Sequence, residues 1–568
     1  MPGRKNFPNL SSAEAVITRV NFNYGRKKTP EEEAFTKLIG RKFDRKVIPV
    51  FFMTLWVGIV SHSIVFMIIF QHPKISRCAV PILEGHFSFE QILNLTVRIQ
   101  DSDYGHYCYY DKRNYEHYIE VHGYDYNAIM AAISEAPNAY SIPCQEDIIK
   151  KIKEEFDDIG EVENFYDYLQ LYCEHKDVKR MTDIALKYGQ FLLSVPIGVI
   201  GDFYGRRTAF LSSGGIFTAG VTLTLIPHVA PIIVGRFLIG SSMILFYTVF
   251  VLFIESASTE ARRAVALLLH EGIAIGRFLE YILYRLLKHW MRISVINAIM
   301  SIFMLIPIMF LNESPRWLYF RGNQEKAYQI IGLPRSGVPN TLLDKRIGPH
   351  FKNFIMPVFR KRVMIQMITI WCTSSVVFLI RSKFSREITN FLLKDLLDSG
   401  TLMGCCTVLT FILMSIIGRG RTIILFFSIT SAVGAMLFFN PRMDKIIIEI
   451  CLVISVTLTE NATFFAFYLI SEFYPNDFRF TGYGLCCGIH GFGDIFHFHT
   501  LSYKIPIKSL FYAPLFLISS ISLASSHFQV ETSGAFVLSD YPREAMRESD
   551  YLEIVKNVAY DKRKLPSS

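Results

Sequence analysis

One segment limits the fold more than any other. Val47–Phe70 runs for a full membrane-spanning length without a single Lys, Arg, Asp or Glu. A helix needs roughly 20 apolar residues to cross the hydrocarbon core of a bilayer. Charged residues make up only 19% of the 568 residues, against about 25% in a soluble globular domain. This deficit indicates that long apolar segments recur and that the chain is a membrane protein.

Eleven further apolar segments of similar length follow. With the first, they predict an all-α membrane protein of twelve transmembrane helices in two six-helix pseudo-repeats. Two turns, Gly198–Arg207 and Ile417–Arg421, occupy equivalent places in the two halves. The segments are Met181–Gly201, Thr208–Ile226, Pro231–Ile254, Ala264–Leu287, Ile293–Leu311, Val363–Ile380, Phe391–Ile417, Thr422–Phe438, Ile446–Ile470, Thr481–Tyr503 and Leu510–Phe528.

Lys and Arg are dense in the N-terminal tail, in the turns after even-numbered spans and in the central loop. Basic residues favour the cytoplasmic side, so we expect a multi-pass membrane protein with both termini in the cytoplasm. The net charge of +9 then sets topology and does not indicate nucleic-acid binding. No secretory signal precedes the first helix, which we expect to act as an uncleaved signal anchor. The expected regions are the tail 1–46, first helix 47–70, extracellular loop 71–180, helices two to six 181–311, central loop 312–362, helices seven to twelve 363–528 and tail 529–568.

The expected extracellular loop carries four of the ten cysteines and the glycosylation sequon at Asn94. The four cysteines predict two disulfides, in any of three connectivities, within a small extracellular domain. The other six lie in apolar segments and are expected to be packing residues. The spacing of Ile, Phe and Leu predicts a helix over Gln145–Leu171. The loop cysteines are Cys78, Cys108, Cys144 and Cys173.

The first of the two turns resembles the signature loop of the major facilitator superfamily, G-x-x-x-D-R-x-G-R-R/K. Gly205 permits a tight turn, and Asp202, Arg206 and Arg207 occupy the charged positions of the pattern. Phe203 replaces the usual first Arg. The resemblance implies a charged conformational latch from which one pair is missing.

Four further segments narrow the resemblance to the organic cation/anion/zwitterion transporter family (solute carrier family 22), of which the chain looks like a divergent member. They are Arg236–Gly240 with the following acidic and basic residues, Glu313–Trp317 (E-S-P-R-W), Ser471–Pro475 with a nearby Arg, and Glu531–Thr532. The long cysteine-bearing loop agrees with this family. The further latch residues that the resemblance implies are Arg236, Glu255, Arg262, Glu313, Arg316, Glu472 and Arg479.

The resemblance implies a carrier of the plasma membrane, not an enzyme, that moves small organic ions by alternating access, through facilitated or exchange transport. No Walker-type loop and no Cys-x-x-Cys or His-x-x-x-His pattern occurs in the sequence. We therefore expect no cofactor, no metal and no nucleic-acid partner, and a monomer in the lipid bilayer, with ion or proton coupling left open. The alternative is a transport-inactive membrane scaffold or receptor, which the altered signature turns favour.

Charged side chains inside membrane spans are candidates for function, because their burial is costly. The fifth span holds His270, Glu271, Arg277, Glu280 and Arg285. Arg277 and Glu280 are three residues apart and can pair on one helix face. His270 matches a position where the family commonly has a substrate-contacting Gln, so we favour a cavity-lining role over a packing one.

The tenth span places Glu460 one helical turn from Phe464, which matches a cavity position of the family. Glu460 is either a cation-binding or proton-coupling group, or the partner of Arg277 or Arg285 across the halves. Both interpretations stay open. The family binds organic cations on aromatic faces; matching positions, which ordinary packing would also explain, carry Phe246, Phe250, Trp371 and Phe378.

The eleventh span lacks the residue that selects substrate charge. Cation carriers of the family have Asp at that position and anion carriers have Arg, whereas this chain has Gly491. His490 is its neighbour and Asp494 lies one turn on. With Glu271, Glu460 and the aromatic cage, Asp494 favours a cation or zwitterion over an anion.

Overall fold

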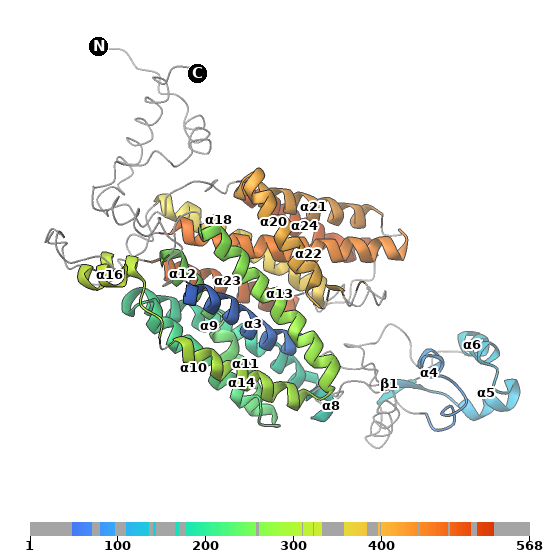
Figure 1. Cartoon of the computed structure of the whole chain (residues 1–568). Helices are drawn as coiled ribbons and strands as arrows, with labels where there is room; N and C mark the ends of the chain where they lie inside the picture. The colour runs from blue at the N-terminus through green and yellow to red at the C-terminus, as the bar shows by residue number, and fades with distance from the viewer. Residues whose placement is uncertain are drawn as a thin grey trace, which may run out of the picture.

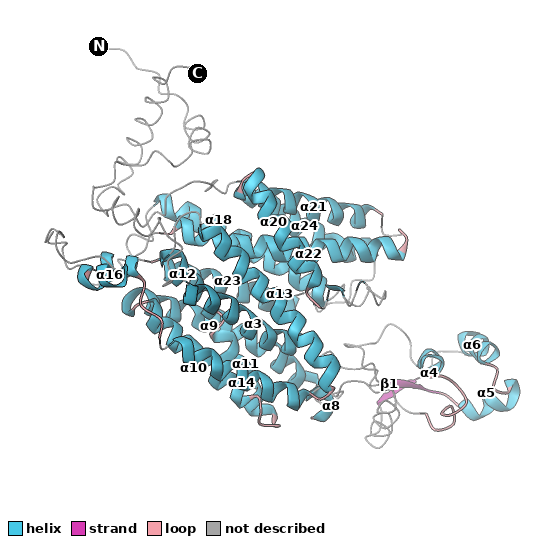
Figure 2. Cartoon of the chain, in the orientation of Figure 1, coloured by secondary structure: helices cyan, strands magenta, loops and turns pink. Residues whose placement is uncertain are grey.

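The computed structural model describes residues 48–70, 80–96, 109–135, 140–143, 165–169, 176–256, 261–308, 310–321, 323–331, 357–382, 393, 396–397, 399–440, 443–474, 478–500 and 508–527. Long helices dominate this part of the chain (Figure 2). They are α3 (Ile48–Phe70), α9 (Lys176–Tyr204), α10 (Arg206–Leu223), α11 (Val229–Ser241), α12 (Leu245–Ser256), α13 (Ala261–Leu287), α14 (Trp290–Ile308), α18 (Pro357–Ser382), α20 (Thr401–Ile416), α21 (Arg419–Phe439), α22 (Lys445–Phe473), α23 (Arg479–Thr500) and α24 (Lys508–His527).

The long helices form two bundles, one from each half of the chain (Figure 1). In the N-terminal bundle α3 packs on α13, and α9, α10, α11 and α14 pack on one another. In the C-terminal bundle α18, α21, α22 and α24 do the same. The bundles meet where α9 packs along α23 and where α13 packs against α20. These two contacts enclose the space in which a solute site is expected.

A helix lies over each predicted apolar segment, with two corrections. The segment Pro231–Ile254 is not one helix, because α11 ends at Ser241 and α12 begins at Leu245. Ser241 and Ser242 turn their hydroxyls back onto the carbonyls of Leu238 and Ile239 at 2.7 and 2.8 Å, which competes with regular helix. In the segment Phe391–Ile417, α20 begins only after Gly400, whose φ of 72° is left-handed.

By length and apolar composition, four helices in the described ranges can cross a membrane: Arg180–Tyr204, Trp290–Pro307, Gly420–Phe439 and Lys445–Ile470. Six shorter apolar helices accompany them. Large apolar side chains are exposed on the outer helix faces, for example Phe303 and Leu517, each 59% exposed. Such faces suit lipid contact. The number of twelve crossings stays a prediction.

The two glycine turns have the same backbone geometry. Gly205 precedes α10 with φ 109° and ψ 160°, and Gly418 precedes α21 with φ 98° and ψ 165°. Neither helix start has a side-chain cap from its own Ncap residue. Positive φ at both positions requires glycine. The sequence-based pairing of these turns is therefore confirmed at the level of the backbone. We call this end of the bundles the turn end.

The region after α3 is small, and it is not purely helical. β1 (Tyr109–Lys112) pairs antiparallel with β2 (Tyr140–Pro143), which corrects the all-α expectation (Figure 2). The short helices α4 (Phe89–Thr96), α5 (Tyr115–His122) and α6 (Tyr126–Glu135) surround a minor core of Val80, Leu83, Ile92 and Tyr115.

The short helix α8 (Phe165–Tyr168) attaches this region to the N-terminal bundle. Phe165 packs with Ile232 and Trp290. We call this the loop end of the bundles, because α9 runs from here to the turn end. Outside the described residues lie most of Gln145–Leu171, both tails, Glu531–Thr532 and the four loop cysteines Cys78, Cys108, Cys144 and Cys173.

A candidate solute site between the two bundles

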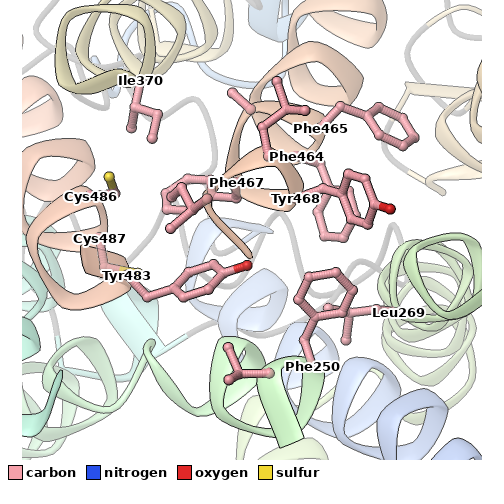
Figure 3. Close-up of a cluster of buried hydrophobic side chains, with 14 of the residues drawn as sticks. Phe250, Leu269, Ile370, Phe464, Phe465, Phe467, Tyr468, Tyr483, Cys486 and Cys487 are labelled. Atoms are coloured by element: carbon pink, nitrogen blue, oxygen red, sulfur yellow. The ribbon is translucent and has the colours of Figure 1, made fainter. Parts of the chain in front are cut away.

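Aromatic side chains fill the space between the bundles. In Figure 3, Phe250 of α12, Phe467 and Tyr468 of α22, and Tyr483 of α23 converge from different helices. Each is at most 2% exposed. The ring of Phe250 lies 5.8 Å from that of Tyr468. The bundles are therefore closed over an aromatic interior, as expected for a carrier that encloses its site.

His270 of α13 faces the C-terminal bundle and is fully buried. Its ring stacks on Phe464 of α22, with centroids 4.2 Å apart. Its Nδ1 lies 2.5 Å from the Thr407 hydroxyl of α20, which also donates to Asn461 Oδ1 at 3.1 Å. Its Nε2 has no hydrogen-bond partner among the described residues. His270 thus joins three helices and keeps one ring nitrogen available.

Arg277 of α13 pairs with Glu460 of α22 at 2.8 Å, and both side chains are largely buried. This is the cross-bundle pair that the sequence left open for Glu460. The predicted pair of Arg277 with Glu280 on one helix face is wrong. Glu280 turns instead to Ser63 and Asn297 inside the N-terminal bundle. Arg285 bonds the Tyr281 hydroxyl of its own helix at 3.0 Å.

Glu271 and Trp371 lie near the same interface. Glu271 is half-buried, and its Oε1 has no hydrogen-bond partner among the described residues. A methyl group added to Gly404 of α20 would lie 3.4 Å from Glu271 Oε2, so this carboxylate faces the other bundle. Trp371 packs edge-on against Phe496 at 5.9 Å. Phe246 and Phe378, the other candidates for the aromatic cage, lie on helices, but the structure does not describe their side chains.

His490 and Asp494 line the seam between α9 and α23. Asp494 pairs with Lys187 of α9 at 2.5 Å, and His490 Nδ1 lies 3.9 Å from the same carboxylate. Gln190 Nε2 lies 3.4 Å from His490 Nδ1. Asp494, which the sequence suggested as a substrate-binding group, is therefore already paired with Lys187 of the other bundle.

Gly491 has a packing reason to lack a side chain. A Cβ added there would lie 3.0 Å from both Lys187 O and Phe191 N of α9. This approach is tighter than real Cβ contacts normally are. A side chain at this position would force α9 and α23 apart by a few tenths of an ångström, and on α23 the neighbouring charge, Asp494, lies one turn further along.

At the turn end, one carboxylate ties the bundles together. Glu255 Oε1 accepts from Arg206 at 3.0 Å and from Arg479 of α23 at 2.8 Å. Its Oε2 accepts from Arg206 Nε at 3.1 Å and from the Ser314 hydroxyl at 2.5 Å. All three charged side chains are fully buried. The acid and both guanidiniums compensate one another, which permits their burial.

Asp202 extends this cluster to the start of α23. Its carboxylate accepts from the backbone N–H groups of Phe480 and Thr481 at 3.1 and 2.7 Å and from the Thr481 hydroxyl at 2.7 Å. Arg206 donates to the same carboxylate at 3.2 Å. Asp202 therefore binds the N-terminus of a helix from the opposite bundle, where a negative charge is favoured.

Glu313 caps α10 from a distance. Its carboxylate accepts from the backbone N–H groups of Arg206 and Arg207 at 2.9 and 3.1 Å. It supplies the acceptor that the Ncap residue Gly205 lacks. Burial raises the pKa of Glu313, and hydrogen bonds from backbone N–H groups oppose that rise. A side chain at Gly205 would collide with this carboxylate.

Arg236 corrects the predicted latch set. It lies at the loop end, where it donates to the Thr182 carbonyl at 3.1 Å and stands 4.4 Å above the Phe165 ring. Arg236 therefore lies near the loop end of α11, whereas Glu255 lies at the turn end. Arg316 is buried in α15 (Pro315–Phe320), near the cluster. The side chains of Arg262 and Glu472 are not described.

The structure also describes the predicted glycosylation site and shows polar residues that the sequence analysis did not name. Asn94 is exposed on α4, as glycosylation would need, and its amide lies 3.4 Å from the Tyr126 hydroxyl. Thr407, Asn461 and Lys187 were missed as site residues. Polar and charged residues inside apolar spans were the available signal.

Comparisons with known proteins agree with this architecture. The sequence model of a family described as sugar (and other) transporter matches residues 161–497. Solute carrier family 22 member 3 of Rattus norvegicus is 25% identical over 341 residues, covering 57% of this chain and 61% of that protein. The putative metabolite transport protein YwtG of Bacillus subtilis (strain 168) is 29% identical over 152 residues, covering 26% of this chain and 33% of that protein. The matches thus span a third to three fifths of these relatives.

A solved structure shares the fold. The proton:xylose symporter XylE, a protein of the major facilitator superfamily bound to 6-bromo-6-deoxy-D-glucose, superposes with a TM-score of 0.53 at 13% identity. The superposition covers 90% of this chain and 99% of that chain. At such low identity the likeness concerns the architecture alone.

Proposed function

We propose that this chain, which belongs to the sugar (and other) transporter family of the major facilitator superfamily, carries a small organic ion across a membrane by alternating access. The charged clusters at the turn end then hold the cytoplasmic side shut. They release when the bundles rock, and the interior opens alternately to either side.

One observation carries this proposal: Arg277 and Glu460 join the two bundles in the buried interior at 2.8 Å. Charges at this depth are costly and mark solute or ion pathways in membrane proteins. A pair that bridges two moving bodies must break or re-form when they separate. A charged solute that replaces either partner would compensate the exposed charge and so couple binding to movement.

We further propose that the solute is a cation or zwitterion and not a simple anion. Arg277 and Lys187 are permanently charged basic groups in the described part of this interior, and they pair with Glu460 and Asp494, respectively. Glu271 keeps one carboxylate oxygen without a bond among the described residues. A cationic head could bind this carboxylate and stack on aromatic rings, which attract positive charge.

Uptake of a radiolabelled panel of organic cations, zwitterions and anions into cells that express the chain would test this function. We expect Glu271→Gln to lower cation uptake at least tenfold, because about 1.4 kcal/mol of lost interaction already gives that factor. Glu325→Gln, in the exposed helix α16 (Gln324–Ile331), is the matched control and should transport normally. Equal uptake by both variants would contradict the site.

The alternative function, a transport-inactive scaffold or receptor, rests on Phe203, which stands in the signature turn and is 39% exposed. The complete bonding of Asp202, Arg206 and Glu255 favours transport over this alternative. A panel of solutes that neither enters cells nor raises the melting temperature of the purified protein would favour the scaffold, since ligands stabilise the state that they bind.

A further inference from the structure

A carboxyl group lies inside the N-terminal bundle, away from the interface between the bundles. Glu280 of α13 is 1% exposed. Its Oε2 lies 2.7 Å from Ser63 Oγ of α3, and Asn297 Nδ2 of α14 lies 3.4 Å from both carboxyl oxygens. All of these partners are neutral. An ionised carboxylate at such a site would lack the compensation that buried charges need.

Basic groups on the neighbouring elements are engaged elsewhere or exposed, as Arg292 of α14 is. Arg277, one turn before Glu280, pairs with Glu460. Arg285, beyond it, bonds Tyr281. On α11, Arg236 bonds the Thr182 carbonyl. No ion pair of Glu280 occurs within the described residues.

Other ionisable groups on the packed helices belong to other clusters. His62 of α3 lies within electrostatic range of Arg277, His270 and Glu460. Glu255 of α12 pairs with the arginines at the turn end, and α20 contains no Asp, Glu, Lys, Arg or His. The surroundings of Glu280 therefore favour its neutral form.

The hydrogen-bond geometry fits a proton on Glu280. Ser63 Oγ lies 2.7 Å from Glu280 Oε2 and 3.4 Å from Asn297 Oδ1. A hydroxyl has one proton to donate. Ser63 can therefore donate to only one of these two oxygens. Both contacts are hydrogen bonds at the same time when Ser63 donates to Asn297 Oδ1 and a protonated Glu280 donates to Ser63.

A small cavity adjoins this chain on the side of the loop end. Its volume is about 30 Å³, and Asn297, Ser294, Thr224 and Arg236 supply polar groups to its wall. This is room for a water molecule with several polar partners. Phe165 of α8 and Trp290 also line it. Asn297 thus touches Glu280 and also borders this cavity, whose wall combines these polar groups with a larger apolar part.

We propose that Glu280 is a proton-binding site in the N-terminal bundle, which holds a proton at neutral pH and exchanges it with water in the adjoining cavity, while Ser63 and Asn297 hold the carboxyl in place by hydrogen bonds. A second part of this proposal rests on the proposed function: the proton bound at Glu280 is the ion that drives solute movement. A metal cation fits less well here. Besides the Glu280 carboxyl, the contacts described around it offer only two side-chain oxygens, Ser63 Oγ and Asn297 Oδ1, whereas hard cations take about six oxygen ligands.

Infrared difference spectroscopy of the purified full chain at pH 7 tests the site. Subtracting the spectrum of Glu280→Gln from that of the wild type should leave one protonated-carboxyl C=O band. Ser63→Ala should shift this band to higher frequency without removing it, because the carboxyl loses its acceptor. Glu271→Gln should leave it unchanged. A difference spectrum with carboxylate bands only, or a band insensitive to Ser63→Ala, overturns the proposal.

Thermal unfolding provides a second measurement. A carboxyl kept neutral by the fold stabilises it fully below the pH at which a Glu of the unfolded chain ionises, about 4.3. This contribution falls as pH rises from there and is gone once Glu280 itself ionises. The melting temperature of the wild type should therefore fall between about pH 5 and 8 more steeply than that of Glu280→Gln. Equal slopes, or selective stabilisation of the wild type by sodium ions, would overturn the proton site.

Transport separates this proposal from the function on which it rests. In proteoliposomes, an inward proton gradient should accelerate wild-type uptake of a transported solute severalfold and leave uptake by Glu280→Gln unchanged. Equal acceleration in both proteins overturns the coupling role. Absence of wild-type uptake would contradict the proposed function. The infrared bands would then still show whether Glu280 holds a proton.

Discussion

At the scale of single residues, the interior is organised by charges whose partners come from other helices. Arg277 finds Glu460 on α22, and Glu280 finds Ser63 on α3. The sequence singled out all three charged residues because apolar spans rarely contain charge. It placed Arg277 with Glu280 because spacing along one helix is visible in a sequence. The rotation of one helix against another is not, so the cross-bundle partner stayed one of two alternatives.

The Arg277–Glu460 pair should be interdependent. Glu460→Gln and Arg277→Ala should each destabilise the protein by about 3–5 kcal/mol, because each leaves a buried charge uncompensated. The exchange Arg277→Glu with Glu460→Arg should recover much of that loss. Chemical unfolding in detergent of the two single variants and the exchanged pair measures this coupling. Additive losses in the exchanged protein would show that the pair contributes nothing.

At the scale of elements, the seam between α9 and α23 depends on glycine. Gly484, Gly488 and Gly491 recur along one face of α23, and their missing side chains admit the backbone of α9. The sequence showed that Gly491 stands where a charged side chain is usual in the family. It could not show that this glycine packs against α9, because that requires knowing which helix lies opposite.

Gly484→Ala should therefore destabilise the protein by about 1–3 kcal/mol through overpacking, since its methyl group would collide with the Ser194 carbonyl. Gly215→Ala is the matched control in α10. Its methyl group would meet nothing within 4 Å, so it should stabilise that helix by about 0.5–1 kcal/mol. Melting temperatures that move in the same direction for both variants would contradict the seam.

At the scale of the whole molecule, the seam is closed at both ends. Asp202 and Glu255 hold α23 at the turn end, and Lys187 holds Asp494 toward the loop end. The family motifs in the sequence identified most of the turn-end cluster, because those residues are adjacent to recognisable turns. Lys187 belongs to no motif, and its role follows only from the packing of α9 on α23.

Glu255→Gln should loosen the turn end, because Arg206 and Arg479 would then share a neutral amide. Cys486 and Cys487, both fully buried at the interface, should react several times faster with a small maleimide in this variant. Glu325→Gln serves as the control for charge. A Cys486→Ser, Cys487→Ser double variant would show the background from Cys405, which is exposed. An unchanged rate in Glu255→Gln would indicate that this carboxylate does not hold the bundles together.

The two turns at Gly205 and Gly418 have a consequence in the genetic code. Every amino acid reached from a glycine codon by one nucleotide change carries a Cβ, and a left-handed φ near 100° excludes nearly all of them. Almost every point mutation at either codon is therefore disfavoured. A saturation mutagenesis screen for surface expression should show both codons as intolerant. Free substitution at either one would mean that the turn can be rebuilt without its glycine.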